Sequence, residues 1–190
     1  MGPILRSLVR TSLLGVVAAA IPLAFACSGG GPKKVDSGVW VADVCDAAID
    51  FEDELEESAE SLQVLAEGDP DDIKEAIDQF SSDAREAIDG FVNEIDDIGQ
   101  PDIDGGDQVI EAIRDHADDE KRAIDDFRDD VNDLDIEDED DFRDEVVEIL
   151  SDGRDLDLRA RLQEIDEDEV DQLVESIDAD SDCSAALFSS

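Results

Sequence analysis

Few residues in this 190-residue chain could carry out covalent chemistry. The chain contains one histidine, His116, and no tyrosine. Nucleophilic catalysis needs a serine or thiolate beside a general base that a third group orients, and no such set is apparent. His116 stands between Asp115 and Asp118, so we interpret it as a solvated helix residue. The sequence therefore predicts no enzymatic activity and no cofactor.

The many carboxylates raise the question of a metal site. An EF-hand loop needs oxygen ligands at its first, third and fifth positions and glycine at its sixth. Segment 102–107 has Gly106 at the fifth position, and segment 178–183 has Cys183 at the sixth. We interpret segment 102–107 as a turn with a helix N-cap. We expect no specific metal site and only diffuse, weak binding of cations to the acidic surface.

The N-terminus has the pattern of a secretory signal. Residues 1–26 contain Arg6 and Arg10 and no acidic residue, and an apolar run over 12–21 is followed by Pro22. The run is shorter than the roughly 20 residues that span a bilayer. We therefore expect an exported protein with a signal peptide over residues 1–26.

Residues 23–27, Leu-Ala-Phe-Ala-Cys, resemble a lipobox, the motif read by lipoprotein signal peptidase. The resemblance implies cleavage before Cys27, a diacylglyceryl thioether on its sulfur, and acylation by a fatty acid such as palmitate. The protein would then be anchored in the cell membrane on its extracytoplasmic side. Ala24 and Ala26 also fit a signal peptidase I site, which would give simple secretion instead.

A glycine-rich stretch follows Cys27, as a tethered domain requires. We expect a lipid-anchored flexible linker over residues 27–36 and one acidic domain over residues 37–188. Lys33 and Lys34 would lie close to lipid headgroups. They could attract the membrane or could be ordinary solvated linker residues, and the sequence leaves both open.

The other two cysteines, Cys45 and Cys183, predict a disulfide. Cysteines that remain in an exported chain normally pair, and a redox role is disfavoured because there is no Cys-x-x-Cys motif. The bridge would join the two ends of the domain. A loop of that length corresponds to a stabilisation on the order of 4–5 kcal/mol in the chain-entropy model.

The formal charge of −43 excludes nucleic acid as an ordinary partner. High charge can also mean disorder, but apolar residues recur at steps of three or four, which predicts helices. Three such series span residues 40–65, 73–98 and 110–134, and the breaks between them contain Gly68-Asp69-Pro70 and Gly99-Gln100-Pro101. We expect Asp69 as an N-cap with Pro70 in the first turn.

The C-terminal third shows three shorter apolar sets, and no segment shows the alternation of a strand. The sequence therefore predicts an all-α fold, an up-and-down helical bundle of three long helices plus shorter C-terminal helices. An aromatic stripe at helical spacing is usually core, so we expect a core built on five phenylalanines: Phe51, Phe80, Phe91, Phe127 and Phe142.

Three segments together resemble an uncharacterised group of small helical lipoproteins and secreted proteins of actinobacteria. These segments are residues 40–45, 99–107 and 182–183. The resemblance implies a helical bundle with a disulfide between its N-terminal and C-terminal parts, and it implies no activity.

We therefore expect a membrane-anchored extracytoplasmic lipoprotein that acts as a cell-envelope interaction module with a protein partner. One alternative is an acidic cation-binding or salt-adaptation surface, which salt-dependent folding would reveal. Another is a nucleic-acid mimic that captures basic proteins, which export disfavours.

Overall fold

The computed structural model describes residues 33–66, 68–135, 138–151 and 157–188. The expected signal peptide and Cys27, the expected lipidation site, lie outside the described residues. Within the part of the chain that is described, none of the helices combines the length and the apolar character needed to cross a membrane.

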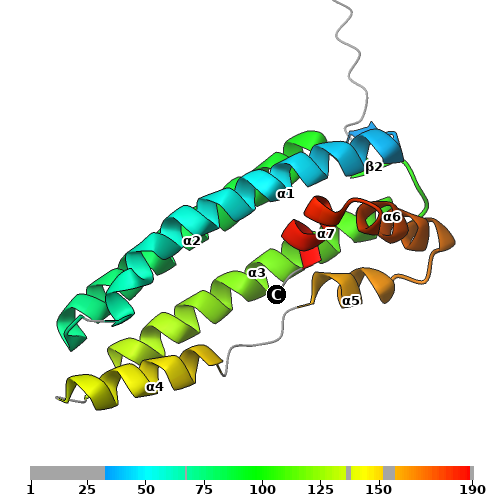
Figure 1. Cartoon of the computed structure of the whole chain (residues 1–190). Coiled ribbons are helices and arrows are strands. Elements are labelled where there is room, and N and C mark those ends of the chain that lie inside the picture. The colour runs from blue at the N-terminus through cyan, green and yellow to red at the C-terminus, as the bar shows by residue number, and fades with distance from the viewer. Residues whose placement is uncertain (1–32, 67, 136–137, 152–156, 189–190) are drawn as a thin grey trace, which may run out of the picture. The chain divides into compact units, whose positions relative to one another are not determined.

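Three long antiparallel helices form the main body of the domain: α1 (Ser37–Ala59), α2 (Pro70–Ile98) and α3 (Gly106–Asn132) (Figure 1). The indole Nε1 of Trp40, near the start of α1, donates a 2.8 Å hydrogen bond to the carbonyl of Gly99 after α2. Lys74, near the start of α2, donates to the carbonyl of Asn132 at the end of α3 at 2.9 Å. The all-α, up-and-down arrangement expected from the sequence is confirmed.

Carboxylate caps begin the first two of these helices. Asp36 Oδ1 accepts from the N–H of Gly38 at 3.1 Å, and Asp69 Oδ1 accepts from those of Asp71 and Asp72 at 3.1 and 3.0 Å. Such caps satisfy N–H groups that have no partner in the first turn. The predicted N-cap at Asp69 is confirmed, and Pro70 is the first residue of α2.

The first helix is shorter than the apolar series predicted. It ends at Ala59, and the chain continues as the 3-10 helix η1 (Glu60–Ala66). The hydroxyl of Ser58 donates to the carbonyl of Glu54 at 2.9 Å, and that of Ser61 to the carbonyl of Ser58 at 2.8 Å. Serine hydroxyls that bond the backbone in this way compete with helical hydrogen bonding.

The prediction of no strands was wrong in a small way. β1 (Lys34–Val35) pairs in parallel with β2 (Gln100–Pro101), so Lys34 and Val35, in the expected linker, pair with the segment after α2. Gly99 enters this pairing with a φ of 95°, and any side chain there would collide with the carbonyl of Lys33. A two-residue pairing set by such a contact leaves no alternating pattern in the sequence.

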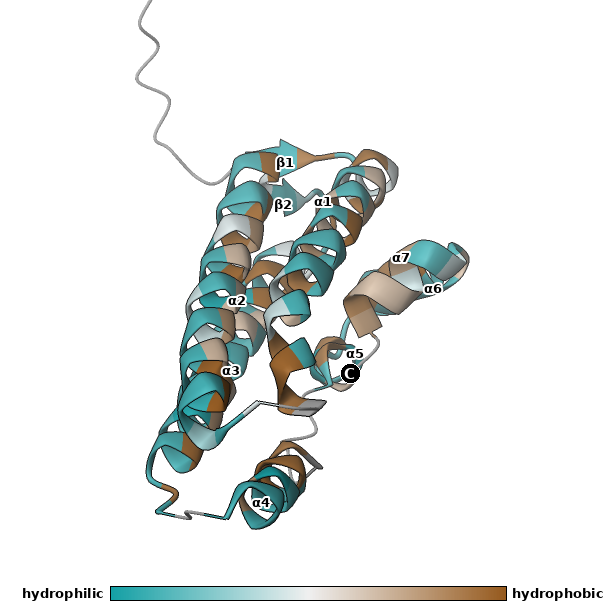
Figure 2. Cartoon of the chain, turned by 60° about the vertical axis from the view of Figure 1, so that its left-hand side comes forward, coloured by the Kyte–Doolittle hydropathy of each residue, from teal (hydrophilic) through white to brown (hydrophobic). Residues whose placement is uncertain are grey.

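Four shorter helices make up the C-terminal third: α4 (Glu139–Ser151), α5 (Leu158–Gln163), α6 (Asp168–Asp178) and α7 (Ser181–Phe188). Of these, α4 packs against α2 and α3, whereas α5, α6 and α7 pack against one another and against α1 or α3. Each helix carries hydrophobic residues beside hydrophilic ones (Figure 2), as a bundle requires.

Two large groups of buried side chains form the core. The first, which we call the clamped core, joins the start of α1, the end of α2 and the start of α3 to α5 and α6; it includes Trp40, Val44, Ile95, Val109 and Leu173. The second, the distal core, joins α2, α3 and α4 at the other ends of the long helices; its buried members are Ile73, Ile77, Val131, Phe142 and Val146.

Candidate ligand pocket

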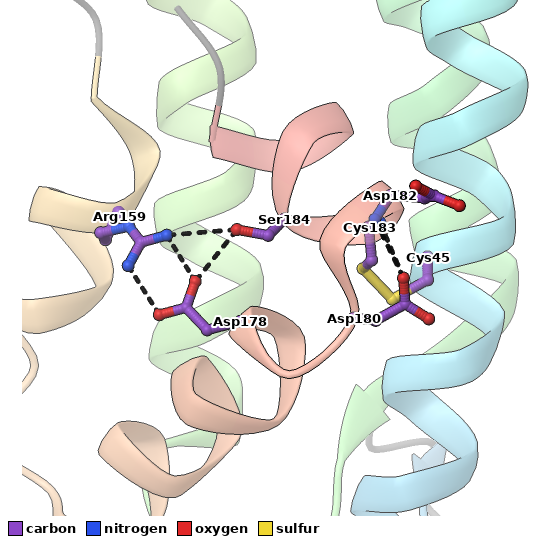
Figure 3. The surroundings of a disulfide bond; sticks show 7 residues. All are labelled: Cys45, Arg159, Asp178, Asp180, Asp182, Cys183 and Ser184. Carbon is purple, nitrogen blue, oxygen red and sulfur yellow. Dashed lines mark hydrogen bonds and ion pairs between the residues drawn. A yellow bond between two sulfur atoms is a disulfide. The ribbon is translucent and has the colours of Figure 1, made fainter.

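A disulfide fixes the C-terminal helix to the first helix. Cys183 in the first turn of α7 is bonded to Cys45 of α1, with 4.9 Å between the Cα atoms (Figure 3). Asp180 begins α7, because its Oδ1 accepts from the N–H groups of Asp182 and Cys183 at 3.1 and 3.2 Å. The bridge predicted from the cysteine count is present, and it places the rest of α7 beside α1.

Arg159 of α5 ties the other side of α7 in place. Its guanidinium forms two hydrogen bonds with the carboxylate of Asp178, at the end of α6, and one of 3.3 Å with the hydroxyl of Ser184 (Figure 3). The same guanidinium lies 4.5 Å from the centre of the Phe188 ring, a cation–π contact. The end of α7 is therefore positioned by α5 and α6 as well as by the disulfide.

A cavity of about 410 Å³ lies between α7 and the long helices. This volume is within the range of sites for small molecules, and the lining is apolar except for a few side chains, as such sites usually are. The lining residues come from five helices: Phe51, Glu52 and Leu55; Phe80, Ala84, Ile88 and Phe91; Ile113, His116, Ala117, Glu120 and Ile124; Leu158; and Ala185, Ala186, Leu187 and Phe188. We call this cavity the pocket.

The interpretation of His116 as a solvated residue was wrong. Its side chain is 17% exposed and lines the pocket, with Nε2 3.4 Å from Oε1 of Glu120 one turn later. Nδ1 is buried and forms no hydrogen bond with any residue that the structure describes. Burial lowers the pKa of His116 below 6.5, and the nearby Arg161 guanidinium lowers it further, so the imidazole is neutral at pH 7.

Glu120 is the second polar group that α3 places in the pocket. Its side chain is 37% exposed, and burial raises the pKa of its carboxyl above 4.5. Arg161 opposes this shift, but its guanidinium is bonded to the carboxylate of Asp119, which also pairs with Arg122. The hydrogen bond from Arg161 lowers the pKa of Asp119. Asp119 thus neutralises most of the positive charge of Arg161, so Arg161 stabilises the Glu120 carboxylate only weakly.

The prediction of five core phenylalanines is confirmed fully for Phe142 and in part for Phe91 and Phe127, which pack against the clamped and distal cores from partly buried positions, and it needs correction for the other two. Phe142 is fully buried, but Phe51, Phe80, Phe91 and Phe127 are only partly buried. The first three of these line the pocket, and the rings of Phe51 and Phe91 stack with centroids 5.2 Å apart. The stripe therefore serves as core at one end and as a pocket wall in the middle.

The acidic segment 102–107, weighed as a calcium loop, has local partners, as segment 178–183 has in Arg159 and in the first turn of α7. Asp102 forms a 3.1 Å ion pair with Lys34, and the N–H of Asp104 donates to the Glu169 carboxylate at 2.8 Å. Gly105, with a φ of 80°, precedes α3 as its N-cap without a side-chain cap. Among the described residues, no three acidic, histidine or cysteine side chains are grouped so that they could hold a metal ion.

The pocket can hold a small molecule by apolar contact and can offer it a neutral imidazole and a carboxylate. Sequence reasoning missed this pairing, although the spacing carried a signal. Ile113, His116, Glu120 and Ile124 follow at helical steps, so the two polar residues occupy one apolar face. The chain shows no match to known protein-family models, to curated proteins or to solved structures.

Proposed function

We propose that this chain is a lipid-anchored protein on the extracytoplasmic side of the membrane, a cell-envelope interaction module that binds a small, largely apolar ligand. The proposal of ligand binding rests on one observation, the pocket, which has the volume and the lining of a binding site. The anchoring rests on the lipobox-like residues 23–27 and the glycine-rich stretch after them.

Binding is a better proposal than catalysis for this pocket. Its described lining includes no serine, threonine or thiol that His116 could activate. Glu120 and His116 are adjacent, but both are held toward their neutral forms by burial. A neutral imidazole and a partly buried carboxylate can orient a ligand through hydrogen bonds.

Calorimetric titration of the mature protein with phenylbutanol tests the binding proposal. We expect saturable binding that Ala186→Phe abolishes, because Ala186 lines the pocket and a phenyl ring there would fill it. The matched control is Ala42→Phe on the exposed side of α1, which should bind normally. If Ala186→Phe and Ala42→Phe bind alike, the pocket is not the site.

Replacement of Cys27 by serine tests the anchor. We expect the wild-type protein to incorporate a radiolabelled fatty acid in its source cells and to sediment with membranes. Cys27→Ser should lose both properties while the disulfide still forms. A wild-type protein that takes up no label would rule out the lipoprotein assignment and leave secretion by signal peptidase I.

A second candidate function, an acidic surface adapted to salt or cations, is favoured by the distribution of charge. Most arginine and lysine side chains that the structure describes already contact carboxylates, as in Arg85–Asp125 and Lys121–Asp89. One surface groove between α1, η1 and α2 includes five acids and no basic residue in its described lining: Glu54, Glu57, Glu60, Asp83 and Glu86. Such a surface attracts counterions without a specific site.

A further inference from the structure

We propose that the ligand of the pocket is an organic cation: a protonated amine or quaternary ammonium group carried on an apolar, ring-sized body. This inference rests on the proposed ligand-binding function and names the class of ligand. It is carried by two features of the pocket wall, the carboxylate of Glu120 and the aromatic rings that line the same pocket.

The charges that line the pocket have one sign. Glu52 and Glu120 contribute carboxylates, and the described lining includes no lysine or arginine. His116, the one lining residue that could become cationic, is neutral at pH 7. A carboxylate or phosphate group on a ligand would therefore meet two acids and no cation in the described lining, whereas an ammonium group would gain an ion pair with the partly buried Glu120.

The aromatic part of the wall favours the same ligand. Phe51, Phe80, Phe91 and Phe188 all line the pocket, and the face of a phenyl ring attracts a cation. One of these rings already does so, since Phe188 holds the Arg159 guanidinium 4.5 Å from its centre. Aromatic faces are a recognised means by which proteins bind quaternary ammonium ligands, and Glu120 adds a carboxylate to them here.

The rest of the molecule strengthens this selection. The formal charge of −43 attracts cations and repels anions, and a cleft with apolar walls focuses such a field. Burial raises the pKa of Glu120 because it disfavours the charged carboxylate, and a bound ammonium group would stabilise that charge. Arg161, whose positive charge acts on Glu120, is itself bonded to the carboxylate of Asp119.

Three probes with one phenylbutyl body test the inference: phenylbutylamine, phenylbutanol and phenylbutyrate, titrated calorimetrically into the mature protein at about 0.15 M NaCl. We expect the amine to bind about tenfold more tightly than the alcohol, and phenylbutyrate to bind most weakly. Glu120→Gln should remove most of the preference for the amine, measured as the ratio of the amine and alcohol affinities within that variant. Glu111→Gln, an equal charge change at an exposed site on α3, should keep the preference.

The outcomes separate this inference from the proposed function. Equal affinities for amine and alcohol, both lost in Ala186→Phe, would overturn the cationic ligand and leave the pocket as a binding site. Amine binding that persists in Ala186→Phe would assign it to the acidic surface and overturn the inference. Failure of all three probes to bind would overturn both proposals.

Discussion

The two ends of the helical domain are stabilised by different means. At the clamped core, Trp40 is hydrogen-bonded to Gly99, β1 pairs with β2, and the disulfide from Cys45 holds α7. At the distal core, α4 is held by packing around Phe142 and by polar contacts such as that of Arg143 with the carbonyl of Gly68 at 3.1 Å.

The difference teaches where a very acidic chain can place a binding site. Repulsion between the acidic side chains acts along the whole domain, and the disulfide between Cys45 and Cys183 opposes it at one end. The pocket is lined by α7, which this bond attaches to α1. A cavity weakens the packing around it, since its lining atoms lack contacts, so it is best tolerated where other interactions hold the helices.

Removal of the disulfide should have the largest effect on this comparison. In the double variant Cys45→Ala, Cys183→Ala, we expect the free energy of unfolding to fall by about 5 kcal/mol, because the bridge closes a loop of 138 residues. Denaturant titration monitored by circular dichroism measures it. Phenylbutanol binding should be lost as well, since α7 would no longer be fixed beside α1. A variant that keeps full affinity would show that Arg159 and packing suffice to place α7.

Truncation of Phe142 should break the distal core alone. Phe142→Ala removes a fully buried ring, and we expect a loss of about 4 kcal/mol in unfolding free energy. Val147→Ala on the same helix is the control, since Val147 is 60% exposed and should cost little. Phenylbutanol affinity should stay unchanged under folding conditions. A matching loss of affinity would mean that the two ends do not behave separately.

The sequence predicted the elements of both ends but not the pocket. Asp69 and Pro70 marked a helix start because caps and fixed φ act locally, and the cysteine count predicted the bridge. The local acids around His116 suggested exposure, but exposure is decided by the helices packed against α3. Periodicity shows which face of a helix is apolar and cannot show whether the facing helices close on it or leave a cavity.

Salt should have a smaller effect that acts on both ends. Between about 0.01 M and 0.15 M NaCl the Debye length falls from about 30 Å to about 8 Å, so distant acids cease to repel one another. With 57 acidic and 14 basic residues, repulsion outweighs the ion pairs that salt also weakens. We expect a gain on the order of 1 kcal/mol in thermal unfolding measurements. An equal gain in the disulfide-free variant would show that the effect of salt does not depend on the disulfide. A thermal midpoint that does not change with salt in either protein would show that repulsion between the acids does not limit stability.

The smallest effect is the most local, the titration of His116. It is the only histidine in the chain, so its imidazole resonances in NMR spectra are unambiguous. We expect its midpoint below 6.5, because burial and the Arg161 charge outweigh the opposing charges of Asp119 and Asp157. Unfolding in denaturant should restore an ordinary value. A midpoint at or above 6.5 in the folded protein would mean that the acidic field, not burial, controls this site.

The sign of this shift sets a pH dependence of stability. Since the pKa of His116 is lowered on folding, the unfolded chain binds a proton in the interval between the folded pKa and 6.5 that the folded chain does not. The contribution of neutral His116 to the free energy of unfolding is therefore complete above pH 6.5 and is lost as the pH falls through that interval. Glu120 works in the other direction, because its raised pKa favours folding below 4.5 and less so as the pH rises above it.

His116→Phe should abolish the first dependence and keep the second, and bound phenylbutylamine should lower the His116 midpoint further by placing a cation beside it.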